Sequence, residues 1–95
     1  MRTFKLSNDA KEDLRRIYQY GCKAFSQQQA DIYFYSFFSM FEKLAENPYS
    51  YQSVDHIRKG YRRAVCGSDS IYYRVYETDV EIMAVLGGQD IEEWL

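Results

Sequence analysis

An aromatic stripe at helical spacing constrains the fold of this chain more than any other feature. Its members recur at offsets of 0, 3, 4, 7, 8, 11, 14 and 15, which is one face of a helix; they are Ala30, Tyr33, Phe34, Phe37, Phe38, Phe41, Leu44 and Ala45. Ser26 with Gln29 three positions later is typical of a helix start, and Pro48 ends the pattern. The stripe therefore predicts an amphipathic helix whose aromatic face packs in the core.

A second helix is predicted upstream, from about residue 8 to residue 23. Ser7 has the character of an N-cap, and Asp9 suits the first turn of the helix dipole. Its apolar positions also share one face; they are Ala10, Leu14, Ile17, Tyr18 and Gly21. Because only a few residues separate the two helices, we expect an antiparallel hairpin.

Strand patterns flank the hairpin. Residues 2–6 alternate, residues 49–60 have no sustained period and are expected to be a loop, and 61–66, 71–77 and 80–86 are β-rich. In the last run, four residues are expected on one face: Val80, Ile82, Ala84 and Leu86. The order β-α-α-β-β-β predicts a single α+β domain over residues 1–95. In it, a helix hairpin covers one face of a mainly antiparallel sheet, and the other face is partly open.

Charge and hydropathy narrow the function classes. The formal net charge is −2, which argues against general affinity for nucleic acid by the chain alone. A local basic patch remains, formed by Arg58, Lys59, Arg62, Arg63 and Arg74. No apolar run approaches the roughly 20 residues that span a bilayer, and the N-terminus lacks a signal-peptide pattern. We expect a cytoplasmic protein without a membrane partner.

Sequence signals for catalysis or cofactors are weak. Cys22 and Cys66 have no metal-ligand spacing and are expected to be free thiols, and no phosphate-binding glycine motif occurs. The single histidine, His56, follows Asp55 in a polar loop, where neighbouring residues do not define a base and its orienting partner. Glu92 and Glu93 suit a solvated face better than a catalytic pair. Neither cofactor nor metal is predicted.

Arginines and tyrosines on the predicted sheet leave three interpretations open. Tyr72 and Arg74 share one face of the middle strand. They belong to an ordinary solvated face, to a docking surface for an acidic peptide, or to an RNase site with arginine as phosphate clamp. Docking is favoured by the bidentate and large-area contacts of these residue types, whereas the RNase reading lacks an obvious proton-transfer partner.

Several motifs in order resemble the RelE/ParE toxin superfamily, and its ParE branch most. They are L-S-x-x-A-x-x-D-L-x-x-I at the first helix, L-A-E-N-P at the end of the second, and then G-Y-R, I-x-Y-R-V and V-E-I-x-x-V-L. Together they extend from Leu6 to about Leu86. The resemblance implies a toxin of a bacterial type II toxin–antitoxin system that inhibits DNA gyrase without being an enzyme. It also implies a hetero-oligomer with a ParD-type antitoxin.

The alternative within the superfamily is a RelE-type ribosome-dependent mRNA interferase. Such nucleases are strongly basic, carry an arginine entering the middle strand, and have a basic and an aromatic residue after the last strand. This chain is acidic, has Ser70 at the first position, and continues as Gly87-Gly88-Gln89 at the second. The ParE-like His and Arg after the last Val-Leu are also missing, which leaves the mode of target engagement open.

Candidate binding residues follow from the resemblance and from the arginine–tyrosine pattern. For the antitoxin they are Arg15, Arg16 and Tyr18 on the first helix and Arg63, Tyr72 and Arg74 on the sheet. For the target they are Gln89, Asp90, Ile91, Trp94 and Leu95. The apolar members of this C-terminal group have the spacing of one helical turn, which either packs on the sheet edge or forms an exposed grip for the target.

Overall fold

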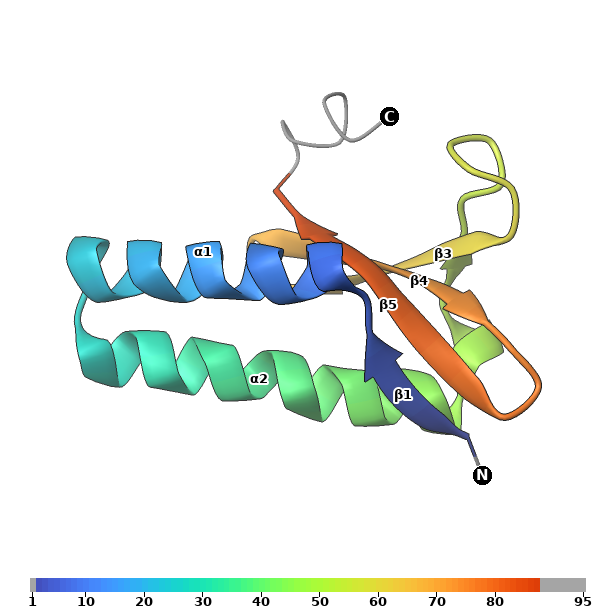
Figure 1. Ribbon diagram of the computed structural model, residues 1–95, viewed down its shortest axis with the longest axis horizontal. Coiled ribbons are helices and arrows are strands. Elements are labelled where there is room, and N and C mark those ends of the chain that lie inside the picture. The colour runs from blue at the N-terminus through green and yellow to red at the C-terminus, as the bar shows by residue number, and fades with distance from the viewer. Residues whose placement is uncertain (1, 88–95) are drawn as a thin grey trace.

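The computed structural model describes residues 2–87 and confirms the predicted α+β order (Figure 1). Its elements are β1 (Thr3–Leu6), α1 (Asn8–Ala24), α2 (Gln27–Glu46), the 3-10 helix η1 (Pro48–Ser50), β2 (Gln52–Ser53), β3 (Tyr61–Cys66), β4 (Asp69–Val75) and β5 (Asp79–Leu86). Both helices agree with the prediction to within a few residues. The segment predicted as a loop contains, in addition, η1 and the two-residue strand β2.

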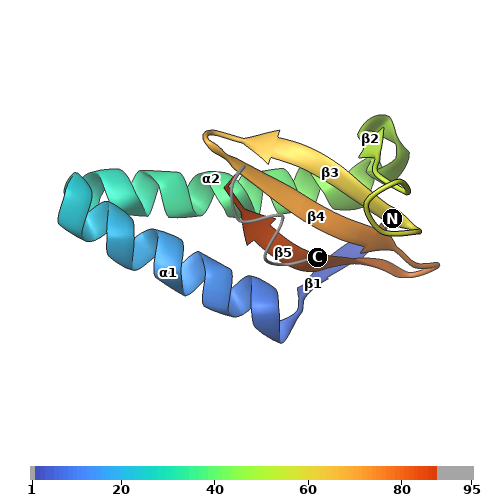
Figure 2. The same ribbon diagram turned by 90° about the horizontal axis from the view of Figure 1, so that it is seen from above.

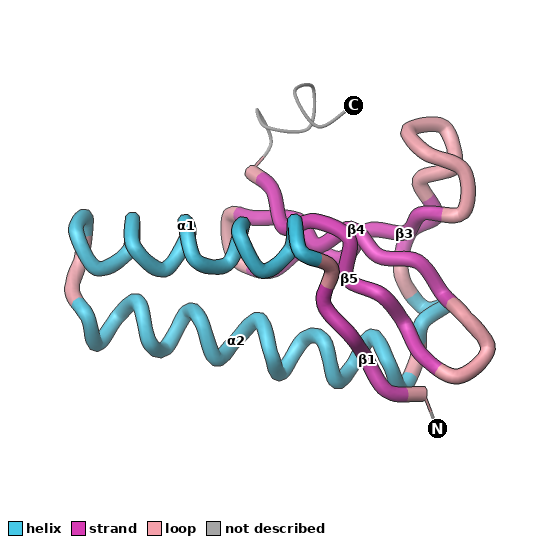
Figure 3. Tube along the Cα trace, in the orientation of Figure 1, coloured by secondary structure: helices cyan, strands magenta, loops and turns pink. Residues whose placement is uncertain are grey.

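The sheet has the order β1-β5-β4-β3-β2 (Figure 3). β1 runs parallel to β5, and every other neighbouring pair is antiparallel. The N-terminal strand therefore lies beside the last strand, although the helix hairpin and strands β2, β3 and β4 separate them in the sequence. The mainly antiparallel sheet that was predicted is confirmed.

Both helices begin at serine caps. Ser7 Oγ accepts a hydrogen bond from Ala10 N at 3.0 Å, and Ser26 Oγ accepts one from Gln29 N at 3.1 Å. The helices lie antiparallel and join at one end (Figure 2). Near this join a Cβ on Gly21 would be 3.2 Å from the Cβ of Ala30, so glycine permits the close approach of the two helices.

The aromatic stripe of α2 forms the centre of the main core. Phe37, Phe41 and Leu44 are fully buried between the hairpin and one face of the sheet, where they join Ile71 and Tyr73 of β4. Burying each such side chain stabilises the fold by about 1.5–3 kcal/mol. Within residues 2–87, no helix is both long and apolar enough to cross a membrane.

A β-bulge in β5 overturns the simple alternation predicted there. Ile82 pairs with Tyr73 and Ala84 pairs with Tyr72, so Met83 is an extra residue in β5. An inserted residue shifts the side-chain phase by one and sends the following residues to opposite faces. The helix-side core contains Val80, Ile82 and Val85, whereas Ala84 and Leu86 lie in a cluster on the other face. The prediction that Val80, Ile82, Ala84 and Leu86 share one face was wrong.

The sheet face away from the helices carries a second apolar cluster, here called the outer-face cluster. It consists of Val54, Tyr61, Tyr72, Ala84 and Leu86, with Ile57 and Met83 packed against it. The connection after β2 folds back on this face, and Val54 N donates to Tyr61 O at 2.8 Å. Of the three interpretations that the sequence left open for this face, an ordinary solvated face does not hold at Tyr72, which is only 3% exposed.

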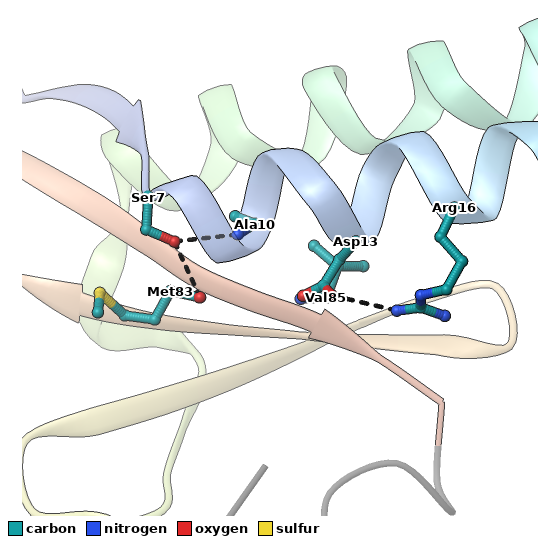
Figure 4. A network of polar contacts seen from close by, with 6 residues as sticks. All are labelled: Ser7, Ala10, Asp13, Arg16, Met83 and Val85. Carbon is teal, nitrogen blue, oxygen red and sulfur yellow. Dashed lines mark hydrogen bonds and ion pairs between the residues drawn. The ribbon is translucent and has the colours of Figure 1, made fainter. Parts of the chain in front are cut away.

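The start of α1 satisfies the edge of β5 beyond the reach of β1 (Figure 4). The register of β1 ends where Leu6 pairs with Ile82. Further along, Ser7 Oγ donates to Met83 O at 2.9 Å, and Asp13 Oδ2 accepts from Val85 N at 2.9 Å. This helix–strand joint supplies partners for backbone groups of β5 that would otherwise be left unpaired where β1 ends.

Candidate functional site

Two hollows lie along the helix hairpin, and we call them together the hairpin groove. The first has a volume of about 390 Å³ near the join of the helices and the β3–β4 turn. The second, of about 470 Å³, lies further along the two helices. Tyr18 of α1 and Phe34 of α2 line both. The groove is mainly apolar and is large enough to accept side chains of another protein.

Tyr18 is fixed at the centre of the groove. Its hydroxyl donates to Asp31 Oδ1 at 2.6 Å, and its ring packs edge-to-face on Phe34 with centroids 5.6 Å apart. The hydrogen bond to Asp31 raises the pKa of the Tyr18 phenol well above its ordinary value, with Cys22 contributing. Tyr18 is therefore a neutral, oriented donor that ties α1 to α2.

Arg15 and Arg16, the other helix candidates, have different surroundings. Arg15 lines the second hollow and pairs with Glu12, in an exposed contact that contributes little to stability. Arg16 Nη2 lies 3.1 Å from Asp13 Oδ1, the carboxylate that also accepts from Val85 N. Arg15 thus faces the groove, whereas Arg16 extends from the helix–strand joint (Figure 4).

The sheet candidates lie on another surface. Arg63 pairs in register with Tyr72, and Arg74 lies over the rings of Tyr61 and Tyr76 at 5.6 and 5.5 Å. Their strands present them on the outer face, away from the groove. The structure does not bring the two predicted trios together, and buried Tyr72 offers no contact area in this conformation. The target candidates Gln89, Asp90, Ile91, Trp94 and Leu95 lie outside the described residues.

Tyr33 is a groove residue that the sequence reasoning assigned only to the core. Its hydroxyl lies 2.8 Å from Asp69 Oδ2 and 2.9 Å from Cys66 O, and it accepts from Ser68 N at 3.2 Å. Burial, with the Asp69 hydrogen bond, raises the pKa of Tyr33 to about 12. Gly67 in the adjacent turn was the available signal, because a Cβ there would lie 2.5 Å from the Tyr33 ring.

Exposed apolar side chains line the groove and were also missed. Tyr20 and Phe25 near the helix join are 66% and 73% exposed, and Tyr35 on α2 is 69% exposed. They lie off the aromatic stripe, so the helical pattern gave them no role. Neighbouring exposed apolar groups beside an apolar groove are typical of a protein–protein interaction surface.

Groups suited to proton transfer are sparse in the described part of the chain. His56 is exposed in the β2–β3 connection, and Tyr18 and Tyr33 have pKa values raised away from neutrality. No three His, Cys, Asp or Glu side chains gather as a metal site within residues 2–87.

Solved structures share the fold. The chain matches a chromosomal ParDE toxin–antitoxin system from P. aeruginosa with a TM-score of 0.80 and 17% identity, over 92% of this chain and 96% of that one. It matches the toxin–antitoxin complex RelBE2 from Mycobacterium tuberculosis at 0.60 and 19%, over 90% and 96%. A YafQ mutant from E. coli matches at 0.64 and 13%, over 96% and 98%. The chain therefore has the same fold as these three proteins.

Sequence comparison identifies the branch. Residues 4–92 match the family model of the ParE toxin of type II toxin–antitoxin systems, parDE. Toxin ParE1 of Caulobacter vibrioides is 37% identical over 86 residues, which cover 90% of this chain and 88% of that protein. The chain belongs to the ParE toxin family of type II toxin–antitoxin systems.

Proposed function

We propose that this toxin inhibits DNA gyrase in the cytoplasm, by trapping cleaved DNA and so blocking replication, and that a ParD-type antitoxin neutralises it in a hetero-oligomer. Membership of the ParE family supports this proposal. The structural observation that carries it is the hairpin groove, an apolar binding surface on a fold whose described residues include no evident acid–base pair. The toxin then acts by binding rather than by catalysis.

The hairpin groove is the proposed seat of the antitoxin. An amphipathic segment would place apolar anchors in the two hollows, against Tyr18 and Phe34, and cover the exposed rings of Tyr20 and Phe25. Acidic residues on the same segment would pair with Arg15, since its present contact with Glu12 is exposed and exchanges at little cost. Arg16 extends from the helix–strand joint, so an antitoxin contact with it would lie outside the groove.

Contact with the sheet arginines requires the antitoxin to reach a second surface. Arg63 and Arg74 lie on the outer face, so an antitoxin that binds them as well as the groove must wrap around the molecule. Charge reversal, Arg63→Glu or Arg74→Glu, should then weaken antitoxin binding more than it lowers the free energy of unfolding. If calorimetry gives an unchanged Kd for both variants, the antitoxin does not use the outer face.

Residues 89–95 are proposed to contact the target, through the apolar side chains Ile91, Trp94 and Leu95 flanked by Gln89 and Asp90. Removing the last four residues separates this role from one in folding. Lost toxicity in a chain that still folds supports target contact. A chain that no longer folds shows that the segment serves the core.

A gyrase supercoiling assay with detection of cleaved-DNA complexes tests the proposed activity. We expect loss of supercoiling and accumulation of cleaved DNA, both reversed by antitoxin. A translation extract programmed with a defined mRNA is the matched control. Codon-specific cleavage there, with unimpaired supercoiling, would refute gyrase inhibition in favour of a RelE-type mRNA interferase.

A further inference from the structure

The two hollows of the hairpin groove differ in the charges that line them. Two cations and one carboxylate line the second hollow, namely Lys11, Arg15 and Asp31. In the first hollow, near the helix join, Asp69 is the single charged side chain among the described lining residues. The groove therefore changes from a mainly basic end to an acidic end along the helix hairpin.

Asp69 keeps its charge available to a partner. Its Oδ2 lies 2.8 Å from the hydroxyl of Tyr33, which is a neutral group. The carboxylates in the ion pairs of residues 2–87 are Asp79, Glu12 and Asp13, so no lysine or arginine of this part of the chain neutralises Asp69. A carboxylate of this kind in a surface hollow is suited to a charge-assisted hydrogen bond with a cation.

Aromatic rings form most of the wall around Asp69. Within residues 2–87 the rings that line the first hollow are those of Tyr18, Tyr20, Phe25, Tyr33 and Phe34. Tyr20 and Phe25 are 66% and 73% exposed, so this wall is open to another molecule. The face of an aromatic ring attracts a guanidinium or ammonium group, and the aliphatic stem of arginine or lysine packs on apolar surface. A hollow of about 390 Å³ with this lining suits a basic side chain better than a purely apolar one.

We propose that the first hollow binds an arginine or lysine side chain of the partner segment that occupies the groove. The aliphatic stem packs against Tyr18 and Phe34, and the cationic head pairs with Asp69. Acidic residues of the same segment pair with Lys11 and Arg15 in the second hollow.

This order of charges fixes the direction in which the segment lies. Tyr20, which lines the first hollow, follows Arg15 by five residues and Lys11 by nine. The basic and acidic residues of the partner should therefore be about 8–14 Å apart along α1. A segment bound in the reverse direction would place like charges together at both ends of the groove.

The inference rests on the proposed function, because the partner segment is part of the antitoxin proposed for the groove. Calorimetry with that antitoxin gives the first test. Asp69→Asn keeps an acceptor for the Tyr33 hydroxyl but removes the charge, and it should raise the Kd about five- to tenfold at low salt. Glu42→Gln removes an equal charge from an exposed position on α2 and should leave the Kd unchanged. An antitoxin that met both hollows with acidic residues would bind Asp69→Asn more tightly, so a lower or unchanged Kd would overturn the proposal.

Tyr33→Phe separates the charge of Asp69 from its structural contact. This variant removes the hydrogen bond to Asp69 but keeps both the carboxylate and the ring. It should weaken antitoxin binding less than Asp69→Asn does, with far-UV circular dichroism confirming the fold of both variants. Equal losses would show that Asp69 acts by holding the β3–β4 turn, and the proposal would be wrong.

A titration of the toxin alone distinguishes failure of this inference from failure of the proposed function. The probe is N-acetyl-arginine amide, and the matched control is N-acetyl-citrulline amide, which has nearly the same shape without the charge. In heteronuclear NMR spectra the arginine probe should shift the backbone amides of Ser68 and Asp69 at several-fold lower concentration than the control, and Asp69→Asn should abolish this preference. Equal shifts with both probes, or no shift at these amides, would overturn the proposal even if the antitoxin binds. A preference for arginine in a toxin that binds no antitoxin would support the cation site and refute the proposed partner.

Discussion

The helix–strand joint makes the sharpest prediction about stability, through Asp13→Ala. The Asp13 side chain is only 16% exposed and carries two contacts, one to Val85 N at 2.9 Å and one to Arg16 Nη2 at 3.1 Å. β1 ends before this point of β5, so no strand replaces the lost acceptor. The substitution should therefore leave the backbone N–H of Val85 without a hydrogen-bond partner.

The magnitude follows from the two contacts. A hydrogen bond to a charged acceptor contributes about 1.5–3 kcal/mol, and an exposed ion pair such as that with Arg16 contributes about 0–1 kcal/mol. Alanine's better helix propensity returns about 0.5 kcal/mol. We expect Asp13→Ala to lower the free energy of unfolding by about 2 kcal/mol, which for a domain of this size lowers Tm by about 8–16 °C.

Urea and thermal unfolding of a small variant series test this reasoning. Asp13→Asn keeps an acceptor for Val85 N and should lose about 1 kcal/mol, and Arg16→Ala should lose less. Glu12→Ala is the control, because Glu12 is exposed and its ion pair is with Arg15 rather than with the edge of β5. Equal losses for Asp13→Ala and Glu12→Ala would show that the joint adds nothing to stability.

Three further predictions concern the turn, the core and the groove. In urea unfolding, Gly67→Ala should destabilise the fold by about 1–3 kcal/mol more than Gly60→Ala. Both glycines have positive φ (60° at Gly67 and 82° at Gly60), but only a Cβ at Gly67 would meet an aromatic ring, at 2.5 Å. Burial raises the pKa of Tyr73 from 10.0 to about 12. The stability that the neutral Tyr73 phenol contributes is therefore complete below pH 10 and is lost as the pH rises through 12. Tyr73→Phe should flatten the fall in unfolding free energy measured between these two pH values. In calorimetry, Arg15→Glu should weaken antitoxin binding by about tenfold. Lys59→Glu, an equal charge reversal in the β2–β3 connection, should leave the Kd unchanged. Equal effects of the two variants would show that the groove is not the docking site.

The helices could be predicted because their signals are local. Ser7 and Ser26 cap the helices within their own first turns. α2 ends at Glu46, two residues before Pro48. The bulge in β5 could not be predicted in this way. Residues 83–86 are all apolar, so they give no polar–apolar contrast from which to read the side-chain phase. Only pairing with β4 shows that Met83 is inserted.

The outer face was misjudged for a related reason. Tyr72 has the alternation of a residue facing away from the helices, and the structure agrees that it does. Its burial depends on Val54 and Ile57, which come from a segment without a regular pattern, and on residues of β5 after the bulge. Burial by irregular segments is a property of tertiary packing, so periodicity carries no information about it.

Helix α1 shows how one element divides between folding and binding. Lys11, Arg15 and Tyr18 have spacings of four and three, lie on one side of the helix, and all line the second hollow. Asp13 and Arg16 lie on another side, where they meet the edge of β5. In the sequence these residues form a single charged stretch, and only the position of β5 separates them. Substitutions at 13 and 16 should therefore act on the free energy of unfolding, and those at 11, 15 and 18 chiefly on the affinity for a partner.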